Sequence, residues 1–191
     1  MTDFREVLDF WFGPADSPEF GKPREAWFRK SDEFDDAIRV RFLDLHRQAA
    51  GGQLQRWQAA PDSLLALIVV LDQFSRNLFR GSSRAFAADA QALAAAQLAV
   101  ARRDDRALLP VQRWFVYLPF EHAEDLASQR RSLELFEGLR GDSDSPDTID
   151  YARRHYEIIA RFGRFPHRNA VLGRISTPEE VEFLKQPGSG F

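Results

Sequence analysis

One stretch of the chain, residues 62–80, limits the folds open to this sequence more than any other. Its first half is an unbroken apolar run over residues 64–71, apolar on every side of a helix. A helix of that kind must be surrounded by protein. Its second half turns polar at Asp72, Gln73, Arg76, Asn77 and Arg80. We therefore expect a central helix from Pro61 or Asp62 to about Leu78, with polar groups on a face that is buried two turns earlier.

The rest of the chain shows helical spacing of apolar residues. The N-terminal stripe consists of Phe4, Val7, Leu8 and Trp11, and a second stripe of Phe34, Ile38, Phe42, Leu45 and Ala49. Ser31 or Asp32 is expected to cap the second helix, and two glycines at 51–52 to end it. Residues 68–70 would suit a buried strand, but helix formers flank them and no partner strand is visible.

Further helices are expected along the second half of the chain. They are an alanine-rich helix from Ser83 over 85–101, a short aromatic one over 111–118 that Pro119 interrupts, a long one over 121–139, and one over 147–162 that Gly163 ends. The run Thr177-Pro178-Glu179-Glu180 forms a capping box that starts the last helix. The sequence predicts one all-α domain, residues 1–191, of about eight or nine helices in antiparallel pairs.

Composition excludes several classes of protein. The chain has no cysteine, which removes disulfide scaffolds, thiol nucleophiles and cysteine-ligated metals. A net charge of −3 argues against a general nucleic-acid binder. The N-terminus has no signal-peptide pattern, and the longest apolar run is far short of the roughly 20 residues of a membrane span. We expect a cytoplasmic protein without nucleic-acid or membrane partners.

Arginine is unevenly distributed. All but Lys22, Lys30 and Lys185 of the 26 basic residues are arginine. Residues 161–174 contain four arginines and no acidic residue, whereas residues 72–84 contain three arginines and one aspartate. The rest of the chain is correspondingly acidic, so the two cationic segments are the places to look for a site.

In the first segment, five polar side chains share one face of the predicted helix. At 100° per residue they occupy an arc of about 140° that continues the buried face. Groups there must pair with each other, with other segments or with a ligand. One interpretation is a structural network of two local pairs, Asp72 with Arg76 and Gln73 with Asn77. The other is a pocket wall that presents Arg76, Arg80 and two amides to an anion.

The second segment places cations around a predicted helix start. Pro166 suits the first position of a short helix that Gly173 ends, with His167, Arg168 and Asn169 in its first turn. Unpaired N–H groups and the helix dipole favour phosphate or carboxylate there, and Arg164 and Arg168 flank it. The alternative is structural: Arg161 pairs with Glu157, and Phe162 and Phe165 fill the core.

The histidines differ in what their positions predict. His122 and His155 face inward, and His155 is interpreted as a core residue, while His46 is expected at the surface. His167 and His122 are the candidate general acids or bases, because histidine titrates near neutral pH. No metal-ligand spacing, glycine-rich phosphate loop or nucleophile motif occurs, so we expect no metal and no cofactor.

Five stretches of the chain carry a family resemblance. They are Leu71-Asp-Gln-Phe-Ser-Arg-Asn-Leu-Phe-Arg-Gly81, Arg161-Phe-Gly-Arg-Phe-Pro-His-Arg-Asn169, Val7-Leu-Asp-Phe-Trp-Phe-Gly13, Pro119-Phe-Glu-His-Ala-Glu124 and Leu172-Gly-Arg-Ile-Ser-Thr-Pro-Glu-Glu180. Over essentially its whole length the chain resembles the bacterial domain of unknown function 924 family. Ser75 and Ala123 stand where many relatives have proline and serine. The resemblance implies an all-helical fold similar to tetratricopeptide-repeat proteins, and it implies no activity.

Three functions remain open at this point. The first is a pocket for a small anionic ligand bearing phosphate or carboxylate, which would include an enzyme of open reaction type with histidine as acid or base. Its residues would be Gln73, Arg76, Asn77, Arg80, Arg164, His167, Arg168 and Asn169. The second is a helical-repeat-like module that docks a peptide or protein partner on an exposed concave surface. The third is that these residues only hold the core together.

Overall fold

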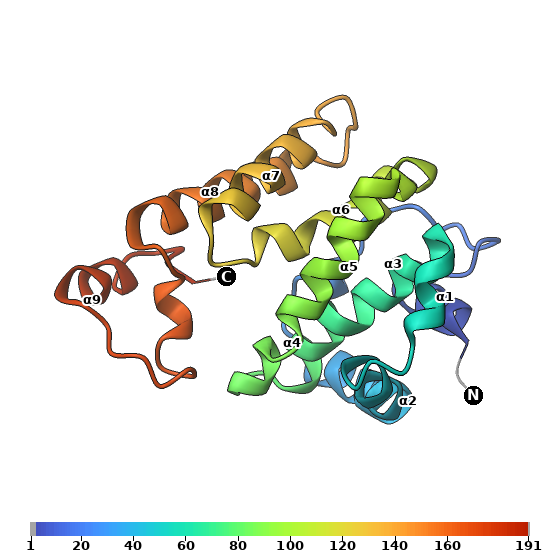
Figure 1. Ribbon diagram of the computed structural model, residues 1–191, viewed down its shortest axis with the longest axis horizontal. Helices are drawn as coiled ribbons and strands as arrows, with labels where there is room; N and C mark the ends of the chain where they lie inside the picture. The colour runs from blue at the N-terminus through green and yellow to red at the C-terminus, as the bar shows by residue number, and fades with distance from the viewer. Residues whose placement is uncertain (1–2, 191) are drawn as a thin grey trace.

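The computed structural model describes residues 3–190, and those residues form helices and connecting segments with no strand (Figure 1). The α-helices are α1 (Phe4–Phe12), α2 (Asp32–Ala50), α3 (Pro61–Val69), α4 (Ser75–Leu78), α5 (Asp89–Arg102), α6 (Pro110–Glu121), α7 (Leu126–Glu137), α8 (Pro146–Phe162) and α9 (Pro178–Leu184). Short 3₁₀ turns lie between them: η1 (Glu25–Trp27), η2 (Gln55–Ala59), η4 (Ser83–Phe86), η5 (Asp104–Ala107) and η6 (Pro166–Arg168). The predicted all-α class is confirmed.

The predicted central helix is present, and it contains an irregular turn. α3 continues through a π-helical turn, η3 (Val70–Phe74), into α4, so residues 61–78 form one continuous helix. Within the described residues the nine labelled segments therefore make eight helices. A π turn places more residues in one turn than an α-helix does, and such turns are frequent at functional sites. Asp72 and Gln73 lie in this turn.

α3 is the centre of the main core. It packs against α1, α5, α6 and η2, and its side chains at Leu64, Ile68 and Val69 have no exposed surface. This complete burial matches the prediction for a helix that is apolar on all sides. Among the described residues, no helix combines the length and the apolar character that a membrane crossing requires.

Aromatic side chains fill the space between α1 and α6. Phe115 of α6 packs edge-on against Trp11, Phe12 and Trp27, with ring centroids 4.9–5.5 Å apart. Trp27 also donates a hydrogen bond from Nε1 to the carbonyl of Trp11 at 2.8 Å. The abundant phenylalanine and tryptophan of the sequence thus joins the N-terminal helix to the middle of the chain.

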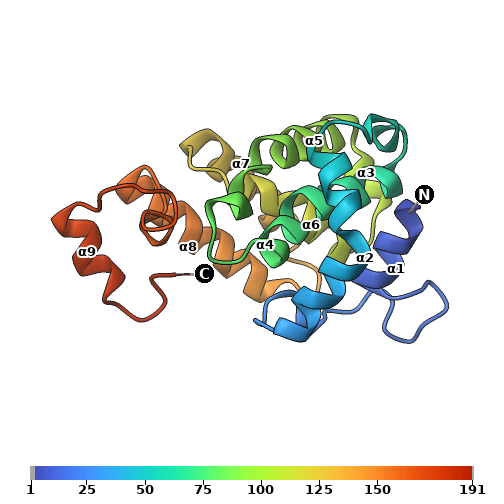
Figure 2. The same cartoon turned by 90° about the horizontal axis from the view of Figure 1, so that it is seen from below.

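A second, smaller apolar cluster lies toward the C-terminus. It consists of Ile158, Ile159 and Phe165, with Phe162 and Phe183 packed against it. In both views α9 lies at one end of the long axis, and α1 lies at the other (Figures 1 and 2). α7 lies along both α6 and α8 and connects the two regions.

Local capping signals behave as the sequence predicts. Ser31 accepts a hydrogen bond from the backbone N–H of Phe34 at 3.2 Å, which caps α2. Thr177 and Glu180 form the reciprocal bonds of a capping box at the start of α9, 3.2 and 2.7 Å long. Gly163 ends α8 in the left-handed region with φ +68°.

Four helix boundaries differ from the prediction. Pro119 does not interrupt the aromatic helix. α6 continues through Pro119 to Glu121, and the proline ring is buried. The break comes at Asp125, whose carboxylate caps α7 by accepting from Ser128 N–H at 2.8 Å, so the predicted helix over 121–139 is wrong. The alanine-rich helix begins at Asp89 after the turn η4, and Pro166 starts only the turn η6.

Candidate functional site

The five polar residues that follow the apolar run do not form one wall. Asn77 and Arg80 point to α2, where both donate to the carboxylate of Asp35 at 2.7–3.0 Å. Arg80 lies beyond the last residue of α4, so the 100° spacing does not apply to it. The predicted pair of Gln73 with Asn77 is absent. Burial opposes a charge on Asp35, but bonds from Arg80 and Asn77 hold its pKa below the usual value.

The other half of this segment surrounds Asp72. Its carboxylate is 1% exposed and accepts hydrogen bonds from Gln73 Nε2 at 2.6 Å and from His122 Nδ1 at 2.8 Å. Arg76 Nη1 donates to the backbone carbonyl of Asp72 at 2.9 Å and forms an ion pair with the carboxylate at 3.0 Å. Burial opposes ionisation, but the charge of Arg76 and the hydrogen bonds from His122 and Gln73 hold the pKa of Asp72 below its ordinary value. The predicted pair of Asp72 with Arg76 is therefore present. Arg76 also contacts Asp89 at the start of α5 through two bonds, 3.0 and 3.2 Å long.

The second cationic segment brings Arg168 to this cluster. Arg168 is 6% exposed, and its Nη1 donates to the carbonyl of His122 at 3.0 Å and lies 3.6 Å from Asp89 Oδ2. Its guanidinium lies between two rings, 4.7 Å from the centroid of Phe86 and 4.5 Å from that of Phe165. The two segments that the sequence singled out thus meet at Arg76 and Arg168.

The remaining predicted residues of the second segment hold α9. Arg164 contacts both carboxylate oxygens of Glu180 at 2.6 and 2.8 Å, and Asn169 Nδ2 donates to Glu180 and to Ser176. Arg164 lowers the pKa of Glu180 to about 2. Arg161 contacts Glu179 at 2.8 Å rather than the expected Glu157.

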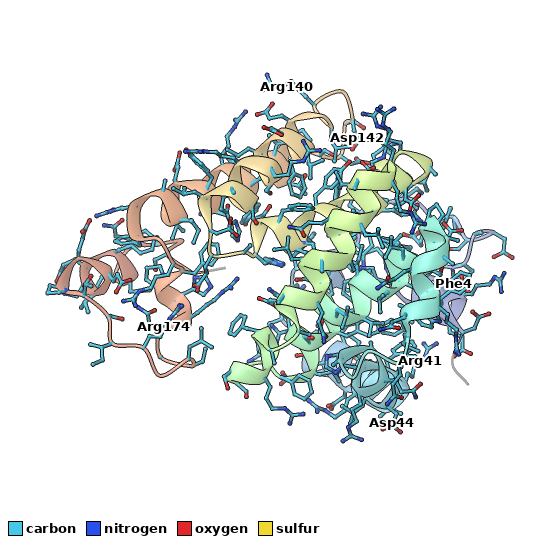
Figure 3. All side chains as sticks on the ribbon, viewed as in Figure 1. Phe4, Arg41, Asp44, Arg140, Asp142 and Arg174 are labelled. Carbon is cyan, nitrogen blue, oxygen red and sulfur yellow. The ribbon has the colours of Figure 1, made fainter. Side chains whose placement is uncertain are left out.

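Arg174 organises the loop between η6 and α9. It lies on that loop near one end of the molecule, away from Phe4 at the other (Figure 3). It donates two bonds to Glu124 at 2.6 and 2.9 Å and one to Asn169 Oδ1 at 2.9 Å. Glu124 in turn accepts from Phe165 N–H at 2.7 Å. These bonds fix the backbone that carries Phe165 and Arg168.

Three of the four histidines gather around the cluster. His122 lies at the C-terminal end of α6 and is half-buried, so it does not begin the inward line along α7 that the sequence predicted. His155 lies on α8, with its ring 6.3 Å from that of His122 and 5.4 Å from that of Phe165. The His167 ring packs at a tilt against that of Phe165, with the centroids 5.6 Å apart. Burial first, and then Arg168, lowers the pKa of His167 to about 4.

His46 is not at the surface, as the sequence analysis expected. It is 6% exposed, and its Nε2 lies 2.7 Å from Ser75 Oγ, which itself donates to the carbonyl of Leu71 at 2.6 Å. The ring also packs edge-on against Phe79. Its place beside the π-helical turn explains the burial, since Ser75 follows that turn directly.

Two buried titratable groups, Glu121 and His155, lie next to His122. Glu121 is 2% exposed, and burial together with the charge of Asp72 raises its pKa well above the usual value. Its Oε1 lies 3.0 Å from Nδ1 of His155, whose pKa burial lowers well below the usual value. Both groups therefore favour their uncharged forms near neutral pH.

Arg168 has one donor with no hydrogen-bond partner among the described residues. Its hydrogen bond and its contact with Asp89 both use Nη1, while Nε is fully buried and makes no hydrogen bond to any described residue. Burial first, and then the charge of Arg76, lowers the pKa of Arg168 to about 10. The single carboxylate at 3.6 Å therefore does not compensate for the lost hydration of this cation. The Nε–Nη2 edge has the fork geometry that binds carboxylate or phosphate.

One cavity lies away from the predicted site residues. A cavity of about 430 Å³ lies among the end of α2, η2, α3 and α5, lined largely by alanine and leucine, and none of the predicted site residues lines it. In the described part of the chain, no group of three or more histidine, aspartate or glutamate side chains is arranged to hold a metal ion.

The acidic partners of the site were not predicted from the sequence. Asp89 falls in the predicted alanine-rich helix, and no role was predicted for Glu121 or Glu124. Phe86, which covers Arg168, was also missed. No spacing pattern could find Asp89 or Phe86, because their contacts join segments far apart in the chain.

Comparisons with known proteins give a family and a fold. The family described as bacterial protein of unknown function (DUF924) matches residues 7–188. A solved structure of a protein of unknown function from Agrobacterium tumefaciens is similar to this chain, with 39% sequence identity and a TM-score of 0.85. The similarity covers 95% of this chain and 96% of that one. No curated protein matches the chain.

Proposed function

We propose a function for this chain from the premise that it belongs to the DUF924 family of bacterial proteins of unknown function. The chain binds a small ligand that carries a carboxylate or phosphate group, and Arg168 is the residue that grips this group. Arg76 adds positive charge beside Arg168, and His167 lies next to it on η6. Asn77, Arg80, Arg164 and Asn169 have structural roles in this proposal.

One observation carries the proposal: the buried Nε of Arg168 has no hydrogen-bond partner among the described residues. A buried donor without a partner is costly, by about 1–3 kcal/mol and more for a charged group. A bidentate anion at the Nε–Nη2 edge would satisfy that donor and neutralise a cation whose pKa burial has lowered. Phe86 and Phe165 hold the guanidinium in one plane, so little side-chain entropy is lost on binding.

The burial of the arginines favours a small ligand over a docked protein. Arg168 is 6% exposed and the Arg76 side chain 20% exposed. A peptide-docking surface needs its cations within reach of a partner's backbone and side chains. A recessed guanidinium between two rings instead suits a group of a few atoms that enters alone.

The direct test observes Arg168 in the unaltered protein. The Nε–H signals of the arginines are followed by ¹⁵N-resolved NMR during titration with inorganic phosphate and, separately, with acetate. The proposal expects the Arg168 signal to shift in a saturable way, while the Nε–H of Arg80, which already donates to Asp35, stays in place. An Arg168 signal that does not respond to either anion would overturn the proposal.

Two variants separate geometry from charge. Arg168→Lys keeps the charge but loses the forked edge, so phosphate affinity is expected to fall by about tenfold or more. Arg80→Gln removes a similar ion pair at Asp35 and is expected to leave affinity unchanged. Equal losses in both variants would show that the binding follows overall charge and not this site.

A further inference from the structure

Asp72 fixes which nitrogen of His122 carries the proton. Asp72 Oδ1 lies 2.8 Å from His122 Nδ1, and the carboxylate is held as an anion by Arg76 and Gln73 as well. An ionised carboxylate only accepts hydrogen bonds, so Nδ1 must donate to it. The lone pair of the neutral ring therefore lies on Nε2.

The second ring nitrogen of His122, Nε2, forms no hydrogen bond with a described residue, and the His122 side chain is 14% exposed. Arg168 donates to the backbone carbonyl of the same residue at 3.0 Å, and its charge contributes to lowering the pKa of the ring. The charged and titratable groups around the ring are Arg76, Asp72, Arg168, His155 and His167.

A purely structural histidine does not need this arrangement. The Asp72 carboxylate already accepts a hydrogen bond from Gln73 and forms an ion pair with Arg76, so its charge has partners besides His122. Burial and then Arg76 lower the pKa of His122, against the opposing effect of Asp72, so the ring is neutral near pH 7. A neutral imidazole with an oriented, unblocked Nε2 is the form that accepts protons.

We propose that His122 is the general base of this site and that Asp72 is its positioning residue. The inference rests on the proposed binding of a small anion at Arg168. Nε2 takes a proton from an acidic C–H or O–H group of the bound ligand, and the electron pair of the broken bond stays on the ligand. The imidazolium that forms is stabilised by Asp72, and the charge that develops on the ligand is stabilised by Arg168. The same nitrogen can then return the proton to the product.

The first experiment reads the tautomer and its response to an anion. Long-range ¹H–¹⁵N NMR of the histidine rings is expected to show His122 protonated on Nδ1 alone at pH 7. Saturation with inorganic phosphate is expected to shift its Nε2 signal. If Arg168 Nε responds to phosphate but His122 Nε2 does not, this inference fails while anion binding stands. If Arg168 does not respond, the anion site itself fails.

The second experiment measures the reactivity of Nε2. Diethyl pyrocarbonate, which modifies neutral imidazole nitrogens, is expected to label His122, as located by peptide mass mapping, and phosphate is expected to slow this labelling at least tenfold. In Asp72→Asn the pH midpoint of labelling should move, and Asp72→Glu should restore it in part. Phosphate protection must persist in Arg80→Gln, whose arginine lies outside the site. Labelling of His122 that phosphate does not slow would overturn the inference, as would a pH profile unchanged in Asp72→Asn.

Discussion

Replacing Glu121 by glutamine tests whether this buried carboxyl group, next to His122 in the chain, is uncharged in the folded protein. Glu121 is 2% exposed, with a pKa raised well above the usual value by burial and by Asp72. Near neutral pH the folded protein therefore holds a proton that the unfolded chain, with a glutamate pKa of about 4.3, has released. Glutamine has the shape of the protonated acid and cannot ionise, so Glu121→Gln removes the need to take up this proton on folding.

The magnitude follows from proton linkage. When folding raises the pKa of a group, the stability that the group contributes is full below its pKa in the unfolded chain. This contribution is lost as the pH rises toward its pKa in the folded protein. Each pH unit above about 4.3 costs the wild type up to ~1.4 kcal/mol relative to Glu121→Gln, until the folded carboxyl ionises. A constant offset of about 1–3 kcal/mol opposes this gain, because the new amide N–H₂ replaces an atom, Oε2, that has no partner among the described residues.

The assay is urea unfolding followed by tryptophan fluorescence at several pH values between about 5 and 8. Glu157→Gln, on the exposed side of α8, is the control for loss of a carboxylate. The free energy of unfolding of Glu121→Gln should improve relative to wild type as pH rises. The reasoning is refuted if the variant instead loses about 3–5 kcal/mol at pH 7, with the deficit growing as pH rises from 4, because that is the behaviour of a buried ion pair with His155.

Three further predictions concern the rest of the site and its support. Glu180→Gln should lower the melting temperature above pH 5, and the difference should vanish as pH falls toward about 2, because Arg164 lowers the pKa of Glu180 to about 2 and the stability it provides is lost on protonation. Sulfate, whose charge is constant over this range, should bind more tightly as pH falls from about 7 toward about 4. The affinity for sulfate should rise by about tenfold for each pH unit by which bound sulfate raises the pKa of His167. Isothermal calorimetry at several pH values measures this affinity. Gly163→Ala should cost about 1 kcal/mol in urea unfolding, since φ is +68° although the added Cβ meets nothing within 4 Å.

Local patterns in the sequence sufficed for most of the helices. Apolar spacing and capping residues act within a few residues of each other, so Ser31, Thr177 and Gly163 could be assigned from neighbours alone. Pro119 was misjudged because proline usually interrupts a helix, whereas α6 continues through it to Glu121. The break comes before α7, where the Asp125 carboxylate caps the new helix, and no cap was predicted at that residue.

The site was predictable only in its cationic half. Arg76 and Arg168 could be found as clustered, aromatic-flanked arginines in a buried context. Which arginines already have a carboxylate partner depends on contacts across the fold, such as Asp35 with Arg80 and Glu180 with Arg164. The regular 100° spacing also failed, because a π turn lies inside the helix and α4 ends before Arg80.

The π-helical turn makes the length of the central helix part of the site. If one residue were deleted between Val70 and Phe74, the helix could return to a regular α repeat. A π turn holds one extra residue in a single widened turn, so side chains on either side of the deletion would keep their relative orientation, and Arg76 would still face Asp89. The deletion would instead change which side chains occupy the buried turn that now carries Asp72 and Gln73. The number of residues in this segment therefore sets which polar groups enter the core.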